Sequence, residues 1–329
     1  MTTAVKTVRE EALIGKRVRV VTAASLFDGH DAAINIMRRI LQAEGAEVIH
    51  LGHDRSVEEI VEAAICEGAH AVAVSSYQGG HMEFFRYLVD ELEARGAGWV
   101  QVFGGGGGTI TSSEIEELHA YGVARIFSPD DGRDLGLQGM IRMIIDGCRS
   151  ESPDAARSAE LAALVDGLAP EQETQVARLI TFLEEDAGDP SADGVALRAR
   201  LDERIGQHER AAVVGFTGTG GAGKSSVVDE LVRRFRTEFP QRSLGMLLID
   251  PTRRRSGGAL LGDRIRMNAI HGSGVFVRSM ATRRANLALS TSVRDGVRVL
   301  QAAGFDLILV ETAGIGQSAS EIVDLVDLS

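Results

Sequence analysis

The stretch RVRVVTAASLFDGHDAAINIM, residues 17–37, decides how the first part of the chain folds. It begins with a Val- and Ala-rich run typical of a buried strand, and its last apolar residues recur at the spacing of one helix face. Asp28, His30 and Asp31 stand at the junction, although a helix N-terminus needs only one capping side chain. The stretch predicts a strand–loop–helix unit with a surplus of polar groups in its loop.

The same alternation continues to residue 148. Apolar runs predict strands at 18–22, 47–51, 71–75, 99–103 and 125–127. Amphipathic segments between them predict helices at about 31–44, 56–67, 81–95, 113–121 and 132–148. Alternating strands and helices form right-handed βαβ units, so we expect residues 1–148 to be a flavodoxin-like, doubly wound α/β domain. Ligands of such domains bind at the carboxyl ends of the strands.

The rest of the chain divides into two parts. Residues 149–210 contain no strand-like run, and segments such as AELAALVDGLA and QVARLITFLEE predict a helical linker. From residue 211 the α/β pattern returns with the strand-like runs AAVVGFTG, SLGMLLID, VFVRS and FDLILVETAG. We assign residues 211–329 to a second α/β domain, and because such domains usually have more strands we expect it to continue beyond Ser329.

Composition narrows the class of protein. The 329 residues have a formal net charge of −12, which disfavours nucleic acid as a partner. The two cysteines are far apart, as expected in a reducing compartment. The N-terminus lacks the apolar core of a signal peptide, and no run of about 18 apolar residues predicts a membrane span. We therefore expect a cytoplasmic protein that contacts neither nucleic acid nor a membrane.

The stretch GTGGAGKS, residues 218–225, fits the phosphate-loop pattern G-x-x-x-x-G-K-[ST] at every fixed position, between a predicted strand and a predicted helix. Backbone N–H groups of such a loop surround phosphate oxygens, the lysine reaches the β- and γ-phosphates, and the serine hydroxyl ligates Mg²⁺. Lys224 is the only lysine after Lys16. The expected nucleotide contacts are Gly218, Gly220, Gly221, Ala222, Gly223, Lys224, Ser225 and Ser226.

Acidic residues end two of the later strands. Asp250 follows LGMLLI and Glu311 follows FDLILV, so both are placed to hold Mg²⁺ directly or through water. ETAGIGQ resembles the γ-phosphate-sensing D-x-x-G of GTPases, with Gly314 as its glycine. PTRRRSGGALLGDRIRM, with Asp263 and Arg266, is expected to be either a switch loop or an exposed basic loop. Arg266 and Gly314 complete the expected nucleotide contacts. The guanine-selecting N-K-x-D is absent, so either the base is read by other residues or the motif lies beyond residue 329, and the small number of strands favours the second.

His30 is either a structural histidine or a metal ligand. Asp28 favours a ligand, because a metal-bound imidazole usually donates its other ring N–H to a carboxylate. One histidine with no Cys or His cluster suits a metal already held by a macrocycle, haem or a corrin. Small residues follow three predicted strands, in Ser25, Ser75–Gly80 and Phe103–Thr109. They leave room for a long, flat ligand at one rim of the sheet.

These residues together resemble the cobalamin-binding domain of the coenzyme-B12-dependent acyl-CoA mutases. The resemblance implies that His30 is the lower axial cobalt ligand, that Asp28 is its partner, and that Gly29 lies in the same loop. Ser75 matches the serine that contacts the nucleotide tail. Tyr77 stands where that family has leucine, Ala33 stands where it has glycine, and the tail-binding glycine pair falls at Gly107 and Gly108.

The later motifs GTGGAGKSS, IDPTRRRSGGALLGDRIRM and ETAGIGQS resemble the G-protein chaperones of methylmalonyl-CoA mutase, which are P-loop, SIMIBI-type GTPases. This resemblance implies that Ser225, Asp250, Asp263 and Glu311 surround Mg²⁺ and the γ-phosphate. It also gives Lys224 and Glu311 the catalytic roles in GTP hydrolysis. The order of the two domains resembles the fused isobutyryl-CoA mutase family over nearly the whole chain.

That family implies adenosylcobalamin, Mg²⁺ and GTP as cofactors and nucleotide. It further implies radical interconversion of isobutyryl-CoA and n-butyryl-CoA at a downstream acyl-CoA-binding barrel, cofactor loading gated by GTP, and a homodimer. Residues 1–329 alone are expected to bind cobalamin and Mg-GTP but not to isomerise acyl-CoA. Two alternatives stay open, a cobalamin carrier or sensor with a regulatory NTPase, and a flavodoxin-type or response-regulator domain at 17–148.

Overall fold

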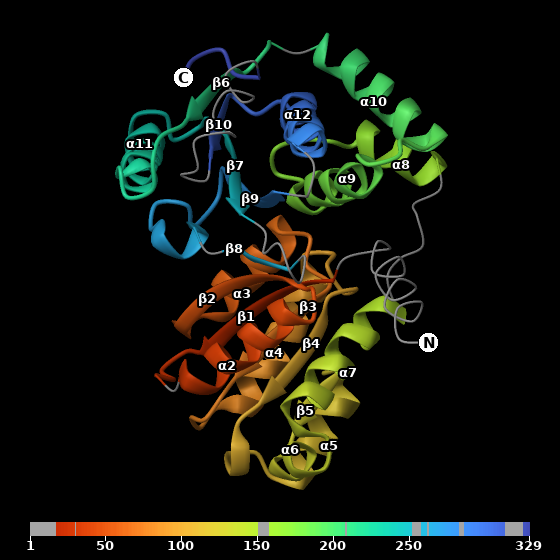
Figure 1. Ribbon diagram of the computed structural model, residues 1–329, viewed down its shortest axis with the longest axis vertical. Coiled ribbons are helices and arrows are strands. Elements are labelled where there is room, and N and C mark those ends of the chain that lie inside the picture. Colours follow the sequence, from red (N-terminus) through yellow and green to blue (C-terminus); the bar gives the residue numbers. More distant parts are fainter. Residues whose placement is uncertain are drawn as a thin grey trace, which may run out of the picture.

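The computed structural model describes residues 18–29, 31–150, 158–207, 209–251, 258–261, 263–282, 286–312 and 325–329. It contains two α/β units, which lie one above the other in Figure 1. The first unit, residues 18–150, forms the lower half of the view, and the second unit, residues 158–329, forms the upper half. Each unit is built on its own parallel sheet.

The first sheet confirms the predicted doubly wound fold. Its strands are β1 (Arg19–Ser25), β2 (Glu47–Arg55), β3 (Ala71–Ser75), β4 (Gln101–Gly105) and β5 (Arg125–Phe127). They lie parallel in the order β5-β4-β3-β1-β2, which is the flavodoxin-like order. The order reverses between β1 and β3, and such a switch point opens a crevice at the carboxyl ends of the strands.

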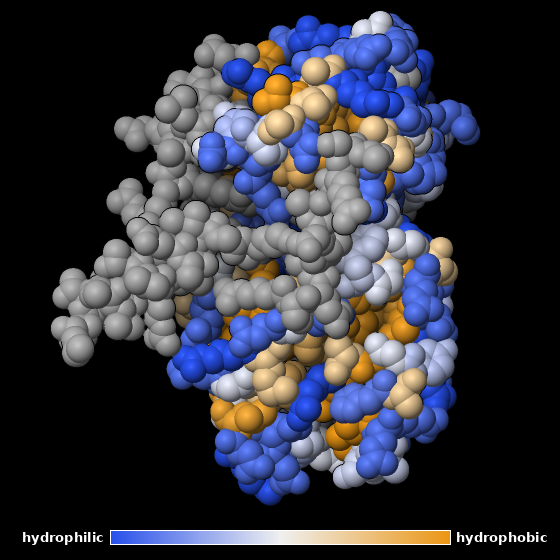
Figure 2. Space-filling model, turned by 90° about the vertical axis from the view of Figure 1, so that its right-hand side faces the viewer, coloured by the Kyte–Doolittle hydropathy of each residue, from blue (hydrophilic) through white to orange (hydrophobic). Residues whose placement is uncertain are grey.

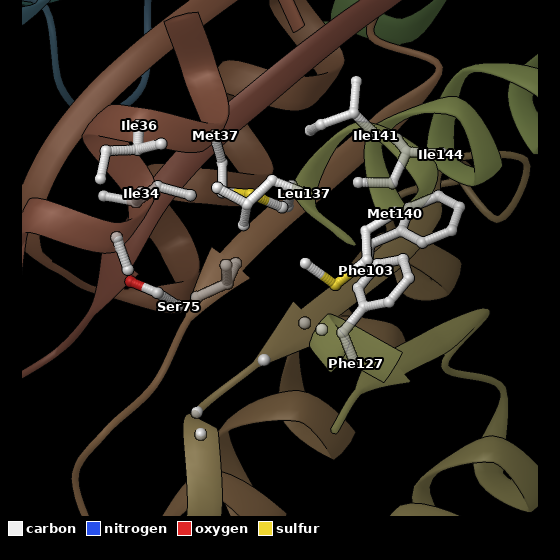
Figure 3. Close-up of a pocket in the computed structure, with 18 of the residues that line it drawn as sticks. Ile34, Ile36, Met37, Ser75, Phe103, Phe127, Leu137, Met140, Ile141 and Ile144 are labelled. Atoms are coloured by element: carbon white, nitrogen blue, oxygen red, sulfur yellow. The ribbon is translucent and has the colours of Figure 1, made fainter. Parts of the chain in front are cut away.

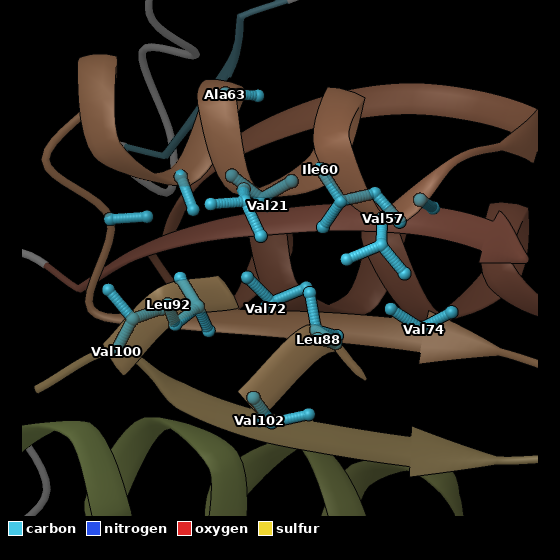
Figure 4. Close-up of a cluster of buried hydrophobic side chains, with 14 of the residues drawn as sticks. Val21, Val57, Ile60, Ala63, Val72, Val74, Leu88, Leu92, Val100 and Val102 are labelled. Carbon is cyan, nitrogen blue, oxygen red and sulfur yellow. The ribbon is translucent and has the colours of Figure 1, made fainter. Parts of the chain in front are cut away.

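Helices cover both faces of this sheet. They are α2 (Asp31–Ala43), α3 (Val57–Cys66), α4 (His81–Ala94), α5 (Ser112–Tyr121), α6 (Pro129–Asp134) and α7 (Gly136–Ser150). Alternate strand residues point to opposite faces, so Val20 packs with α2 and α7, whereas Val21 packs with α3 and α4. Figure 4 shows the second of these cores, with Val72 and Val74 of β3 facing Leu88 of α4.

The second unit contains the predicted strands at β6 (Ala212–Phe216), β7 (Leu244–Pro251), β9 (Val275–Thr282) and β10 (Leu307–Glu311), in the parallel order β6-β10-β7-β9. Helices α11 (Lys224–Glu238) and α12 (Asn286–Ala303) follow β6 and β9. The predicted linker forms α8 (Ser158–Asp166), α9 (Glu173–Asp186) and α10 (Ala192–Ile205). These three helices share a hydrophobic core with α12. The domain boundaries at 148 and 210 stay predictions.

One strand links the two units. β8 (Ala259–Leu261) lies within the stretch predicted as a switch or basic loop, yet it pairs in parallel with the first three residues of β2 and becomes the sixth strand of the first sheet. An edge strand such as β2 offers unpaired N–H and C=O groups to an extended segment. Gly258 permits this approach, because a Cβ there would lie 2.3 Å from the carbonyl oxygen of Gln42.

Buried ion pairs also join the units, at the amino-terminal end of the first sheet. Glu67, at the end of α3, accepts hydrogen bonds from the N–H (2.9 Å) and hydroxyl (2.8 Å) of Ser279 in β9. Arg19 of β1 pairs with Glu47 at 2.7 Å and lies 3.5 Å from Glu184 of α9. Burial alone would lower the pKa of the Arg19 guanidinium. The nearby carboxylates together have the larger effect, so the pKa is raised above its usual value.

A second pair of arginines completes this junction. Arg264 lies in the 3₁₀ helix η2 (Asp263–Arg266), which follows β8. Its guanidinium donates to the Val277 carbonyl at 2.9 Å and reaches Glu62 of α3 at 3.2 Å. Arg278 of β9 pairs with Glu184. We refer to Arg19, Glu47, Glu62, Glu67, Glu184, Arg264, Arg278 and Ser279 as the junction network.

Candidate functional sites

A largely apolar cavity of about 330 Å³ opens at the carboxyl ends of β3, β4 and β5 (Figure 3). Helices α2 and α7 form its walls, with Met37 and Leu137 projecting toward each other from the two helices. The stacked rings of Phe103 and Phe127, 6.5 Å apart, form part of its lining. The cavity therefore accepts a large, mostly apolar group at the place where the fold predicts a ligand.

Two predicted site residues with polar side chains lie in the lining of this cavity. Ser75 ends β3, and its buried hydroxyl has no hydrogen-bond partner within the described part of the chain. A buried polar atom without a partner is costly, so this hydroxyl is placed to bind a polar atom of a ligand. Tyr77 also lines the cavity. The donor set thus fits the nucleotide tail of a cobalamin, which combines an apolar base with polar sugar and phosphate.

Four glycines of the run 104–108 contribute to the cavity lining. Gly104, Gly105, Gly106 and Gly107 line the cavity, whereas Gly108 is not among its lining residues. A Cβ at Gly106 would lie 1.9 Å from the carbonyl oxygen of Ser76, so no other residue fits there. Of the expected pair, Gly107 lies in the lining and Gly108 is its neighbour in the chain, so their contact with a nucleotide tail stays a prediction. The wide run of five glycines gave no sequence signal to choose among them.

Asp28 is fully buried beside the cavity. Its Oδ2 accepts a hydrogen bond of 2.6 Å from the backbone N–H of Tyr77, and its own N–H donates to the Ser25 carbonyl at 3.0 Å. The Ser25 hydroxyl donates to that of Ser76 at 3.0 Å. The loop after β1 is thereby fixed to the loop after β3. Gly29 is exposed, and His30 lies outside the described residues, so its role as cobalt ligand stays a prediction.

Most of the cavity lining carried no sequence signal as a site. Apolar residues of α2 and α7 provide it, at Ala33, Ile34, Ile36, Met37, Leu41, Leu137, Met140, Ile141 and Ile144. The sequence shows these as ordinary core positions of amphipathic helices. Ile36 and Leu137 nevertheless stay 49% and 45% exposed. Figure 2 shows apolar side chains at the surface of the first unit, the lower half of the view.

The phosphate-loop sequence lies between a strand and a helix, as predicted. It runs from the end of β6 to Gly223, which precedes the first turn of α11. Gly218, Gly221 and Gly223 have φ angles of 147°, 78° and 85°, which side chains other than glycine rarely adopt. Lys224 Nζ donates to the carbonyl oxygens of Gly218 and Thr219 at 3.0 and 3.1 Å. The loop is exposed, and its N–H groups and lysine suit a polyphosphate. The expected contacts Gly220, Ala222 and Ser226 lie in this exposed stretch.

The predicted Mg²⁺ ligands come together in part. Ser225 Oγ donates to Glu311 Oε1 at 2.6 Å, which joins the first turn of α11 to the end of β10. Asp250 is buried near the end of β7, the strand beside β10, two residues beyond the level of Glu311. A hydroxyl and two carboxylates at one sheet edge are suitable ligands for Mg²⁺. The described residues contain no cluster of three or more His, Cys, Asp or Glu side chains able to hold a metal.

The structure says less about the remaining residues that were predicted to bind nucleotide or Mg²⁺. Asp263 begins η2, but its side chain is not described. Arg266 ends η2 and is exposed. Gly314 lies outside the described residues. The turn that follows η2 is bound to α11, the helix after the phosphate loop, because Asp229 accepts the N–H groups of Asn268 and Ala269, both at 2.8 Å.

Comparisons with known proteins assign both units. Residues 18–133 match the family described as "B12 binding domain", and residues 176–329 match "Methylmalonyl Co-A mutase-associated GTPase MeaB". The first unit thus matches a family of cobalamin-binding domains, and the second unit matches a family of GTPases. The GTPase match begins inside α9, in the segment predicted as a linker. Among the described residues, no helix is long and apolar enough to cross a membrane.

The chain is also related along most of its length to individual proteins that contain both domains. It is 55% identical over 313 residues to the fused isobutyryl-CoA mutase of Geobacillus kaustophilus, and the match covers 95% of this chain. The corresponding proteins of Nocardia farcinica and Cupriavidus metallidurans are 54% and 52% identical, again over 95% of this chain. The chain is therefore a relative of the fused isobutyryl-CoA mutases and spans 28% of the length of each of the three.

Proposed function

We propose that this chain supplies the cofactor-binding and nucleotide-binding part of a fused isobutyryl-CoA mutase. The supporting observation is the apolar cavity at the carboxyl ends of β3–β5. Its lining includes the Ser75 hydroxyl, which has no hydrogen-bond partner among the described residues. His30 would hold the cobalt of adenosylcobalamin, Asp28 would orient the His30 loop, and the cavity would receive the nucleotide tail. Adenosylcobalamin supplies radical chemistry when bound.

The acyl-CoA substrate belongs to the proposal for the whole protein. By similarity to its relatives, interconversion of isobutyryl-CoA and n-butyryl-CoA would take place at a barrel downstream of this chain. A cytoplasmic homodimer is the proposed form of the whole protein. The residues of this chain would bind and orient the cofactor, and the second unit would bind GTP with Mg²⁺ at Ser225, Asp250, Asp263 and Glu311, with Lys224 and Glu311 acting in its hydrolysis.

Titration with adenosylcobalamin, followed by visible absorbance, tests the proposed cofactor site. Ile36→Trp places a large side chain at the cavity wall from a half-exposed helix position, so we expect loss of binding with little effect on folding. Val195→Trp is the matched control, because Val195 is a 58% exposed aliphatic residue on α10 in the other unit. Equal cobalamin affinity of both variants would contradict the assignment of the cavity.

We further propose that nucleotide binding controls cofactor loading through β8 and η2. This segment follows Asp250, a proposed Mg²⁺ ligand, and contains Asp263, a second one. β8 pairs with the beginning of β2, and a Cβ built at Gly52, near the other end of β2, would lie 3.0 Å from the Ile265 side chain of η2. A change in the position of this segment with nucleotide state would therefore change its contacts with both ends of β2.

Cobalamin affinity in the presence of Mg-GDP and of a non-hydrolysable GTP analogue tests this coupling. Coupling free energies between sites typically correspond to affinity changes of about 5- to 150-fold. We expect a difference of this order between the two nucleotides, and we expect Lys224→Ala to abolish it. Equal cobalamin affinities with both nucleotides, measured under conditions where both are bound, would contradict the gating proposal but not the cobalamin site.

A further inference from the structure

The turn after β1 contains an exposed and strained aromatic residue. Phe27 is 80% exposed and has a φ of 62°. Positive φ is unfavourable for a bulky side chain, and an exposed phenyl ring is unfavourable in water. Within the described part of the chain, Asp54 is the only other non-glycine residue with a positive φ, at 57°. Glycine or asparagine at position 27 would avoid both costs, which suggests that the ring has a use outside the free chain.

A hydrogen bond joins Phe27 and Asp54, the two non-glycine residues with positive φ. The backbone N–H of Phe27 donates to Oδ1 of Asp54 at 2.7 Å, which ties the β1 turn to the carboxyl end of β2. The next residue, Asp28, points the opposite way and is held by the Tyr77 N–H at the end of β3. The turn is therefore fixed to both neighbouring strands. Its geometry buries a carboxylate and turns the adjacent phenyl ring toward solvent.

We propose that Phe27 is a cofactor-contacting residue whose ring packs against the corrin macrocycle, and that Asp54 is a positioning residue that holds it there. This inference rests on the proposed function. Three observations favour the cofactor over a protein partner as the occupant. Phe27 lies at the carboxyl edge of the sheet where the cavity opens, it is three residues before His30, and it adjoins Asp28, which is bonded to the cavity-lining Tyr77.

Cobalamin affinity of single variants of the 329-residue chain tests the inference, with adenosylcobalamin as the probe and visible absorbance as the readout. We expect Phe27→Ala to raise the Kd about tenfold, because burial of one face of a phenyl ring is lost. Phe239→Ala is the matched control, since Phe239 is a 54% exposed phenylalanine of the second unit. Its Kd is expected to equal that of the wild type.

The positioning role of Asp54 needs a separate comparison. Asp54→Gly removes the acceptor and tolerates the positive φ, whereas Asp54→Asn keeps a side-chain oxygen for the Phe27 N–H. We expect weaker cobalamin binding for Asp54→Gly and near wild-type binding for Asp54→Asn. Thermal unfolding of the cofactor-free Phe27→Gly variant is expected at or above the wild-type temperature, because glycine relieves the strain.

The outcomes separate this inference from the proposed function. A wild-type chain that binds no cobalamin would overturn both. Equal Kd values of the wild-type chain and Phe27→Ala for cobalamin would overturn the inference alone. A protein partner would then be the candidate for contact with the Phe27 ring. A Phe27→Gly variant that unfolds well below the wild type would also overturn it, because the ring would then be needed for folding.

Discussion

Glu67 joins the first unit to the second, so its replacement should destabilise the folded chain. Its side chain is fully buried, accepts two hydrogen bonds from Ser279, and lies 3.6 Å from both Arg19 and Arg264. Glu67→Gln keeps the shape but removes the charge, which leaves both guanidinium groups with less compensation. Removal of one partner of a buried ionic network typically costs about 3–5 kcal/mol. We expect Glu67→Gln to lower the free energy of unfolding by about this amount.

Urea unfolding followed by tryptophan fluorescence measures this effect at the right place. The only tryptophan of the chain, Trp99, belongs to the first unit, and the Arg178 guanidinium of α9 lies 5.9 Å from its ring centroid. Its emission therefore reports on the contact between the two units. Glu117→Gln is the control, because Glu117 is an exposed partner of Arg86 within the first unit. A Glu67→Gln variant as stable as this control would refute the account of the junction network.

Three further results follow from the structure. Burial and the charge of Arg19 lower the pKa of His70 from 6.5 to about 4. Between pH 4 and 6.5 the His70 imidazole is therefore protonated in the unfolded chain but neutral in the folded chain. The free energy of unfolding should therefore fall by up to about 3 kcal/mol as the pH drops through this window, and urea titrations of His70→Gln should lack that part of the slope. Gly258→Val should separate β8 from β2 and lower the free energy of unfolding by about 1–3 kcal/mol. Hydrogen exchange at the Val48 amide should become faster, and an unchanged exchange rate would contradict this pairing. Lys224→Ala should abolish Mg-nucleotide binding in calorimetric titrations, and an unchanged Kd would exclude the phosphate-loop assignment.

Local sequence patterns predicted the two sheets well, because each strand and helix has a clear period. The strands of residues 18–127 and the phosphate loop at 218–225 were identified from such patterns alone. β8 was not predicted, since ALL in a glycine- and arginine-rich stretch is too short to indicate a strand. Its pairing depends on the exposed edge of β2, more than 200 residues earlier in the chain. Non-local contacts of this kind leave no local signal.

The candidate cofactor site was predicted only in part for the same reason. Asp28, Ser75 and the glycine run stand out because polar or small residues follow strands. The apolar lining does not, since Ile36 and Leu137 have the pattern of ordinary helix faces and are brought together only when α2 and α7 pack side by side. The conformation of Phe27 was equally hidden, because its positive φ depends on a hydrogen bond to Asp54 at the end of another strand.

Electron paramagnetic resonance of bound cob(II)alamin tests the central claim most directly. The unpaired electron of cobalt(II) couples to the nitrogen of its lower axial ligand, so the chain can be labelled with ¹⁵N-histidine while the cofactor keeps ¹⁴N. Coordination by His30 predicts that each superhyperfine triplet becomes a doublet on labelling and that the doublet is lost in His30→Ala. Triplets that persist for cobalamin bound to the labelled wild-type chain would show that the cofactor keeps its own base and would contradict coordination by His30.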